Sequence, residues 1–492
     1  IKKEGALERA RDWIRSSDQA TKTAALIGCG RSCGNEGLNL AVPILVAMIA
    51  EEDEEKNSAA AQLLGRMQNP EYGFLLEGLM EHPAEQVQVA AIEAGGEIAS
   101  VDLVPQMLEL YRRAPLREHV HDSLAKMPPD CLPKILAFID DRKQDQETRA
   151  RLIDVLSTQG TAEAQKALWK LFAPDMPLII RKAAGGSLQS LAENQRLIPI
   201  DAAELEERER STSAKIEVLN RTCNEIGDED DFSAVSLSEQ AHLEIGCLFH
   251  LLSLQFDPDK INRISHNLFS QNSVLRANAI ELLDDLLPLR LSPIVKLLEP
   301  LVEKQGEQGM GLSIETANEV MKCEAWPRVL AAYHMNGSDP DAVMQLTDGE
   351  RRIYDLVGVV SALKGVSIFR NVPGNYMVAL AMAVQKLEAK RGLVLFEEGD
   401  TGDALFLVTD GEISVRVSGS EVAKLGAGEC FGEMALVDGL PRSATCIAAE
   451  DSELLVLSDH DFLTFLHGHG SIALGVLQTL TQRLRNQLEA TH

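Results

Sequence analysis

Short alanine-rich amphipathic segments recur along the N-terminal part of the chain and constrain its fold more than any other feature. They read NSAAAQLLGRM, VQVAAIEAGGEI, REHVHDSLAKM, TRARLIDVLSTQG and IRKAAGGSLQSL. A period of roughly 30 residues aligns them, with five residues in register: Leu64, Gly95, Leu124, Leu156 and Leu188. An apolar stretch such as YGFLLEGLM precedes each segment, so one period holds two short helices. Because a helix pair cannot bury its apolar stripe alone, successive pairs are expected to stack into an α-solenoid.

The repeat resembles HEAT-like repeats, and a non-repetitive helical bundle is the alternative. Only 4% of the residues are aromatic while 45% are hydrophobic, so small aliphatic side chains must fill the core, as in helical repeat proteins. We expect a HEAT-like α-solenoid over residues 1–195 and further HEAT-like helices over 241–335. The segment between them, 196–240, contains AAELEERERSTSAK and GDEDDFSAVS, which predict a charged helix followed by an acidic linker.

Beyond residue 350 the pattern changes from helical periodicity to short β-type segments. GLVLFEEGD, ALFLVTDGEISVRV and SATCIAAEDSELLVLS are separated by turns that contain Gly and Asp, and VTDGEI predicts a hairpin. Short strands at this spacing predict a small β-barrel of the jelly-roll type within residues 350–470. The fold class expected for the chain is therefore mainly α, an α-solenoid followed by a small β-barrel with flanking helices.

The last segment, SIALGVLQTLTQRLRNQLEA, has the periodicity of an amphipathic helix. One face of that helix would carry six apolar residues: Ile472, Val476, Leu477, Leu480, Leu484 and Leu488. Residues 471–492 are therefore expected to form a C-terminal lid or dimer helix.

The stretch FGEMALVDGLPRSATC, residues 431–446, has the composition of a ligand site. Gly432 would precede a short helix, whose free backbone N–H groups and positive dipole end suit an anion. Arg442 can add a charge-assisted clamp on the same anion. Glu433 would repel a phosphate but can accept a hydrogen bond from a sugar hydroxyl. A molecule with one phosphate beside one free ribose hydroxyl satisfies all three.

This stretch is similar to the phosphate-binding cassette of cyclic nucleotide-binding domains, and the similarity extends upstream through FEEGDTGDALFLVTDGEISV to cover roughly residues 350–490. The resemblance implies that Glu433 binds the ribose 2′-hydroxyl and that Arg442 binds the cyclic phosphate. It also implies backbone contacts from the cassette helix and a phosphate or purine contact just after the arginine. The ligand-binding residues implied in this way are Phe431, Gly432, Glu433, Met434, Ala435, Arg442, Ser443 and Ala444.

Two alternatives stay open at this site. An internal salt bridge between Glu433 and Arg442 could occupy an empty, degenerate domain. The ligand could also be cGMP, because the hydroxyl of Ser443 can hydrogen-bond the purine edge of either nucleotide; cAMP is favoured by its prevalence alone.

The remaining composition excludes several classes of function. A formal net charge of -28 without any basic run disfavours nucleic acid as a partner. The CGRSC pair lacks the second cysteine pair that a zinc site needs, and neither HVHD nor HGHG has a further ligand nearby, so no metal is expected. The chain has no Walker A, H-E-x-x-H or G-x-S-x-G motif, so no enzymatic activity and no cofactor are expected.

The order of the two regions suggests how they work together. No apolar run reaches the roughly 18 residues needed to cross a bilayer, so a cytoplasmic location is expected; Lys2 and Lys3 at the start would also suit the cytoplasmic side of a preceding membrane helix. Repeats followed by a nucleotide domain resemble the cytosolic part of bacterial ATP/ADP-translocase-like transporter fusions. We expect a cAMP-sensing regulatory module whose repeats relay binding to a transporter or protein partner. A non-binding HEAT-repeat scaffold and a subunit of a signalling enzyme with a separate catalytic chain are the alternatives.

Overall fold

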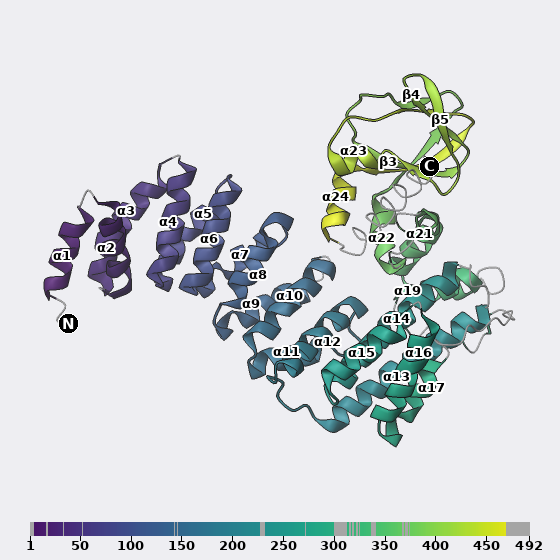
Figure 1. Ribbon diagram of the computed structural model, residues 1–492, viewed down its shortest axis with the longest axis horizontal. Helices are drawn as coiled ribbons and strands as arrows, with labels where there is room; N and C mark the ends of the chain where they lie inside the picture. The colour runs from purple at the N-terminus through teal and green to yellow at the C-terminus, as the bar shows by residue number, and fades with distance from the viewer. Residues whose placement is uncertain are drawn as a thin grey trace. The chain divides into compact units, whose positions relative to one another are not determined.

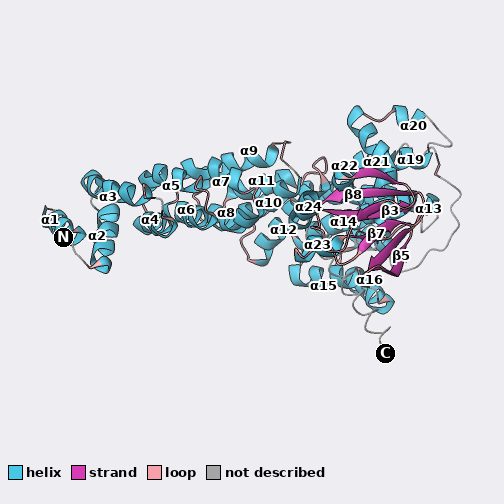
Figure 2. Cartoon of the chain, turned by 90° about the horizontal axis from the view of Figure 1, so that it is seen from above, coloured by secondary structure: helices cyan, strands magenta, loops and turns pink. Residues whose placement is uncertain are grey.

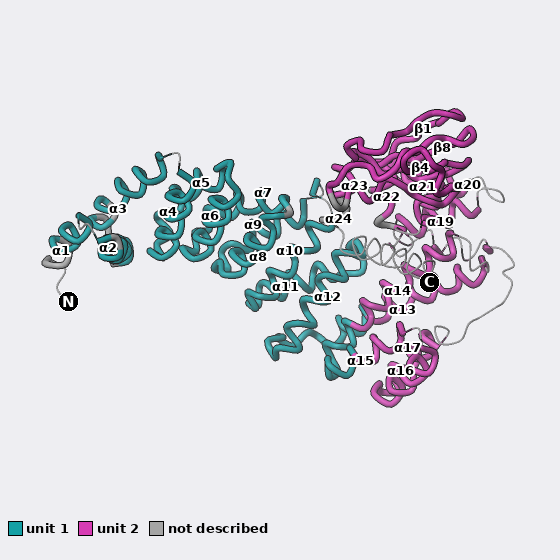
Figure 3. Tube along the Cα trace, turned by 45° about the horizontal axis from the view of Figure 1, so that its top comes forward, with its two compact units in different colours: residues 1–208, 250–262 teal, residues 209–249, 263–492 magenta. Residues whose placement is uncertain are grey.

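The computed structural model divides the chain into two compact units, residues 1–208 with 250–262 and residues 209–249 with 263–492 (Figure 3). The segment 471–492, expected to be a lid or dimer helix, lies outside the described residues. The structure describes residues 4–15, 18–32, 34–51, 53–141, 143–144, 146–226, 232–270, 272–299, 312–313, 316, 319–320, 323, 325–335, 341–366, 369, 372 and 374–468.

The first unit is built from short helices that follow one another in pairs (Figures 1 and 2). Helices α4, α6, α8, α10 and α12 pack each against the next, and α5, α7, α9 and α11 each pack against the helix that follows them. All five residues that define the sequence register are buried. The helices are α1 (Glu4–Ile14), α2 (Gln19–Ser32), α3 (Gly34–Ile49), α4 (Glu54–Met67), α5 (Gly73–Met80), α6 (Glu85–Ile98), α7 (Val104–Leu110), α8 (Arg117–Ala125), α9 (Leu132–Asp140), α10 (Gln146–Gln159), α11 (Ala162–Leu171) and α12 (Leu178–Glu193).

Glycines in these helices allow neighbouring backbones to approach closely. A Cβ atom on Gly65 of α4 would lie 3.0 Å from the Cα of Ala94 in α6. A Cβ atom on Gly96 of α6 would lie 2.8 Å from the Cα of Ser123 in α8. Because real Cβ atoms do not approach backbone atoms so closely, the alanine-rich and glycine-rich segments of the sequence set the spacing between successive helices.

The segment expected to be a linker is mostly helical. The charged helix is α13 (Ala202–Ile226), and α14 (Phe232–Ser253) begins within the stretch expected to be an acidic loop. The expected linker to residue 240 is therefore too long. The reason is that Leu237 and Ala241, both buried, continue the apolar face of the downstream helix toward its N-terminus.

In the described part of the chain, further helices lead from α14 to the strands. They are α15 (Pro258–Leu268), α16 (Ser273–Leu286), α17 (Ser292–Leu298), α19 (Ala325–Met335), α20 (Asp341–Met344), α21 (Asp348–Gly365) and α22 (Gly374–Ala383). The side chain of Thr347 caps α21 by accepting a hydrogen bond from the Glu350 N–H, while the Glu350 carboxylate accepts one from the Thr347 N–H. This capping box fixes where α21 begins.

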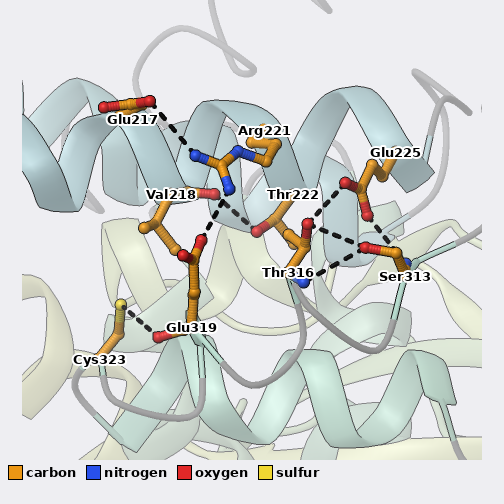
Figure 4. A network of polar contacts seen from close by, with 9 residues as sticks. All are labelled: Glu217, Val218, Arg221, Thr222, Glu225, Ser313, Thr316, Glu319 and Cys323. Atoms are coloured by element: carbon orange, nitrogen blue, oxygen red, sulfur yellow. Dashed lines mark hydrogen bonds and ion pairs between the residues drawn. The ribbon is translucent and has the colours of Figure 1, made fainter.

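A polar network in the second unit ties Ser313, Thr316 and Glu319 to α13 (Figure 4). The Arg221 guanidinium contacts Glu319 at 2.8 Å and Glu217 at 3.3 Å. One turn further along α13, the carboxylate of Glu225 accepts hydrogen bonds from the Ser313 N–H at 2.8 Å and from the Thr316 hydroxyl at 2.6 Å. The charged face of α13 is therefore used for packing within the unit.

The C-terminal strands form a small antiparallel β-sandwich of two four-stranded sheets (Figure 2). One sheet has the order β1-β8-β3-β6 and the other β2-β7-β4-β5. Two short helices, α23 (Glu433–Asp438) and α24 (Asp459–Gly468), accompany them. The strands are β1 (Gln385–Ala389), β2 (Val394–Phe396), β3 (Ala404–Asp410), β4 (Ile413–Val417), β5 (Ser420–Leu425), β6 (Cys430–Phe431), β7 (Thr445–Ala448) and β8 (Ser452–Ser458).

The hairpin predicted at VTDGEI is wrong, because β3 and β4 belong to different sheets. The chain crosses between the sheets at Gly411, whose φ is 90° and where a Cβ would lie 2.7 Å from the Cα of Ser452. The hairpin in this region instead joins β4 to β5 across Ser418 and Gly419, which have φ values of 50° and 81°. The Asp-Gly pair therefore predicts a sharp turn of the chain but not which strands pair on either side of it.

Two apolar clusters hold the strands in place. One lies between the sheets and includes Phe406 and Phe431. The other is continuous from the helices of the second unit into the strands and α23. Its members include Leu237 of α14, Val357 and Val360 of α21, Met377 of α22, Leu405 and Leu407 of β3, Leu436 of α23 and Phe462 of α24.

Candidate functional site

Gly432 makes the turn between β6 and α23. Its φ is 85°, in the left-handed region that favours glycine. A Cβ at this position would lie 2.5 Å from Nη1 of Arg442 and 3.0 Å from the carbonyl oxygen of Ala404. Both the backbone conformation and the space around it therefore require glycine here.

The guanidinium of Arg442 is buried against this turn, with 3% of the residue exposed. Its Nη1 donates to the carbonyl of Gly432 and its Nη2 to the carbonyl of Ala404, both at 2.8 Å. The carboxylate of Asp403 lies 3.6 Å from Nη2. Burial lowers the pKa of Arg442, and Asp403 is the strongest influence that opposes this shift. The arginine nevertheless remains charged, since guanidinium groups do not lose their proton in proteins.

Another donor of Arg442, the Nε–H group, is not used. Within the part of the chain that the structure describes, its buried Nε–H has no hydrogen-bond partner. A buried donor without an acceptor costs free energy, and such a group in a native fold needs an explanation. An anionic ligand that accepts from this group would supply one.

Glu433 is the first residue of α23 and directly follows the glycine that Arg442 contacts. It is also buried, with 4% exposure. The charges of Glu433 and Arg442 both influence the thiol of Cys446. Burial raises the pKa of this thiol to about 12, Arg442 opposes the increase, and Glu433 adds to it. The structure thus brings the predicted carboxylate and guanidinium to one place, with a neutral thiol beside them.

The other predicted site residues differ in exposure. Met434 and Ser443 are exposed, and Ala444 is half-buried. Ala435 is buried against Gly402, where a Cβ would lie 2.4 Å from the Ala435 Cβ. Phe431 is buried between the sheets, where it packs with other aromatic rings.

Sequence reasoning missed the residues that hold Arg442 from outside the cassette. Ala404 supplies a carbonyl, Asp403 a carboxylate, and the ring of Phe396 lies under the guanidinium, with 4.2 Å between the ring centroid and Cζ. These residues belong to FEEGDTGDA, some forty positions earlier in the sequence. No local spacing signals such a contact, because it arises from the pairing of strands that are distant in sequence.

A model of the family described as cyclic nucleotide-binding domain matches residues 386–469. This segment is a cyclic nucleotide-binding domain. The match begins in β1 and reaches the end of α24, so it contains every residue of the site described above.

Several known proteins and solved structures are similar to part of this chain. The cyclic AMP receptor protein of Thermus thermophilus is 36% identical over 129 residues, which are 25% of this chain and 59% of that protein. A cyclic nucleotide-gated potassium channel of Rhizobium etli is 32% identical over 134 residues, 27% of this chain and 38% of the channel. The crystal structure of a cyclic nucleotide-binding domain from Methylobacillus flagellatus is 30% identical, with 28% of this chain and 83% of that chain covered and a TM-score of 0.25. The chain therefore spans less than two thirds of the length of either curated relative.

The described residues contain no group of three or more His, Cys, Asp or Glu side chains placed to hold a metal ion. Among the helices drawn from those residues, none combines the length and the apolar composition that a membrane span requires. The histidines of HVHD contact carboxylates: His119 lies 2.9 Å from Glu93, and His121 lies 3.6 Å from Asp154.

Proposed function

We propose that the chain is a cyclic nucleotide-sensing regulatory module with cAMP as the favoured ligand. The observation that carries the proposal is the buried guanidinium of Arg442, which keeps an unused Nε–H donor and feels the charge of the buried Glu433 carboxylate. The names of similar proteins support it: a cyclic AMP receptor protein, a cyclic nucleotide-gated channel and, at 34% identity over 85 residues, the cAMP-dependent protein kinase regulatory subunit of Debaryomyces hansenii.

The two charges suit two parts of one ligand. Arg442 would donate to the oxygen atoms of the cyclic phosphate, in a site that is largely screened from water and where charge-assisted hydrogen bonds are strong. Glu433 would accept a hydrogen bond from the ribose 2′-hydroxyl. The proposal gives the chain no catalytic step, and it keeps the cytoplasmic location expected from the sequence.

Within this proposal, the helices relay nucleotide binding to a transporter or protein partner. The successive helix pairs of the first unit would form a HEAT-like α-solenoid, an architecture that offers an extended surface to partners. In the second unit, Leu436 of α23 lies in the apolar cluster that also contains residues of α14 and α21. A shift of α23 on ligand binding would therefore act on helices outside the nucleotide domain.

Calorimetric titration of the full chain with cAMP tests the nucleotide assignment. Arg442→Ala should weaken binding by about 2–4 kcal/mol, or one to three decades in affinity, because the phosphate loses its charged donor. Arg416→Ala is the matched control, since Arg416 lies in the same domain on β4 and donates to Ser414. Equal affinity of the wild type and Arg442→Ala would overturn the site, and parallel titrations with cGMP identify the preferred nucleotide.

The second candidate is the non-binding scaffold with a degenerate domain. It is favoured by one observation: each Nη group of Arg442 already donates to a backbone carbonyl, Nη1 to that of Gly432 and Nη2 to that of Ala404. Titration with 2′-deoxy-cAMP separates the two candidates. If Glu433 reads the hydroxyl, the deoxy ligand should bind at least about tenfold more weakly, because a buried carboxylate would lose its donor. Absence of binding by either ligand supports the scaffold.

A further inference from the structure

Three phenylalanines from three strands gather beneath Arg442. Phe406 of β3 and Phe431 of β6 are partners in the strand register and stack with their centroids 5.2 Å apart and their planes at 9°. Phe396 comes from β2 in the other sheet and contacts both rings, at 5.7 Å and 5.9 Å between centroids. The cluster therefore joins the two sheets at the place where Arg442 is buried.

Arg442 lies closer to one ring of this cluster than to another. Its Cζ lies 4.2 Å from the centroid of Phe396 and 5.9 Å from that of Phe406. The guanidinium carbon thus lies over the ring of Phe396, while the carbonyls of Gly432 and Ala404 accept hydrogen bonds from Nη1 and Nη2. A cation held by a ring on one side and by two carbonyl oxygens has few other orientations available.

We propose that Phe396 is a positioning residue for Arg442 and raises the affinity of the site for the cyclic phosphate. This inference rests on the proposed function. The quadrupole of the ring attracts the guanidinium and keeps its plane fixed before the ligand arrives, so that less order has to be created on binding. A leucine would fill much of the same space but would not attract the cation.

A crossed comparison with Phe406 separates positioning from packing. Phe396 is only partly buried, whereas Phe406 is 8% exposed and stacks on Phe431. Phe406→Leu should therefore lower the thermal unfolding midpoint more than Phe396→Leu. For cAMP affinity the order should be reversed: about five- to thirtyfold weaker for Phe396→Leu and about twofold or less for Phe406→Leu. Phe396→Tyr, which keeps an aromatic face, should bind within about twofold of the wild type.

The inference requires that Phe396→Leu causes the larger loss of cAMP affinity and Phe406→Leu the larger loss of thermal stability. Wild-type affinity in Phe396→Leu, or affinity losses that simply follow the losses of stability, would overturn it. In an Arg442→Gln background, Phe396→Leu should have no further effect on affinity, because the charge that the ring attracts is gone. An undiminished effect in that background would also count against the proposal.

A measurement without nucleotide distinguishes failure of this inference from failure of the proposed function. In the full chain with labelled arginine, the Nε–H resonance of Arg442, identified by its loss in Arg442→Gln, should be shifted upfield by the Phe396 ring and should move downfield in Phe396→Leu. If the resonance does not move, the contact and the inference are wrong whatever the ligand. If it moves but the wild type binds neither cAMP nor cGMP, the proposed function fails and the positioning role fails with it.

Discussion

At the scale of single residues, Gly432 is constrained both by its backbone and by its neighbour. Gly439, at the other end of α23, shares the positive φ but has open space where a Cβ would be, since no atom lies within 4 Å. We expect Gly439→Ala to cost about 1 kcal/mol from backbone strain alone. Gly432→Ala should cost about 2–3 kcal/mol and weaken cAMP binding about tenfold or more, because its methyl group would displace the Arg442 guanidinium.

Thermal unfolding and calorimetry on the two variants check this difference. The decisive quantity is affinity, because strain common to both glycines cancels in the comparison. If both variants bind cAMP equally well, the guanidinium does not depend on the space above Gly432, and its position in the site has another cause.

A second residue-scale prediction concerns acid stability. His250 of α14 is half-buried, with Nδ1 2.6 Å from Oε1 of Gln189, and the partial removal of its ring from water lowers its pKa to about 4, with a contribution from nearby Lys182. Its pKa in the unfolded chain is about 6.5. Between these values the unfolded state binds the extra proton, so stability should fall as the pH drops through that window, by about 3 kcal/mol in full.

His250→Gln should remove this pH dependence because glutamine does not titrate. Hydrogen exchange of the amides of α12, the helix that contains Gln189, measures the local change of stability with pH. The rates are compared between pH 4 and 7 after correction for intrinsic exchange. A stability slope as steep in His250→Gln as in the wild type would mean that other groups produce the acid sensitivity.

At the scale of elements, sequence reasoning succeeded where the signal is local. The apolar residues in register, from Leu64 to Leu188, are all buried, and the glycine, carboxylate and guanidinium of the cassette meet in one place. It failed where pairing is not local. The turn at Gly411 joins two sheets instead of one hairpin, because an Asp-Gly dipeptide specifies a sharp turn but not the partners of the strands that leave it. The contact of Phe396 with Arg442 could not be foreseen for the same reason.

The packing of neighbouring helices gives an element-scale prediction. A methyl group on Gly96 would meet the backbone of Ser123 in α8, whereas one on Gly78 of α5 would meet nothing within 4 Å. We expect Gly96→Ala to lower the free energy of unfolding by about 1–3 kcal/mol through overpacking. Gly78→Ala should raise it by about 0.5–1 kcal/mol through the lower entropy of the unfolded chain. Denaturant unfolding of the two variants compares them, and destabilisation of both to the same extent would contradict the close approach of α6 and α8.

At the scale of the whole molecule, the second unit contains a physical connection between the nucleotide site and the helices before it. The ammonium group of Lys364 in α21 pairs with the carboxylate of Glu239 in α14 and donates to the carbonyl of Val372 at 2.9 Å. The same carboxylate accepts from the Gly374 N–H, at the start of α22, at 2.9 Å. This clamp holds the ends of the segment between α21 and α22 to α14. Leu436 of α23 shares an apolar cluster with these helices. A movement of α23 can therefore change both contacts of Glu239, the one with Lys364 and the one with Gly374.

Hydrogen exchange with and without cAMP tests whether binding uses this connection. A ligand shifts a conformational equilibrium only through contacts that it makes better in one state. The ligand contacts proposed here are made by Glu433, at the start of α23, and by Arg442, shortly after its end. We therefore expect α23 to move first. Protection of amides in α21, and in α14 through the Lys364–Glu239 contact, should then change about fivefold or more, which corresponds to the lower end of common coupling energies. Arg442→Ala, which removes the ligand contact, should abolish the change at the same cAMP concentration.

Lys364→Met, which removes the clamp without touching the site, should preserve the response of residues 431–445 but reduce that of α14. If residues 431–445 alone respond in the wild type, the domain binds its nucleotide without acting on the helices, and the regulatory role must lie in another part of the chain.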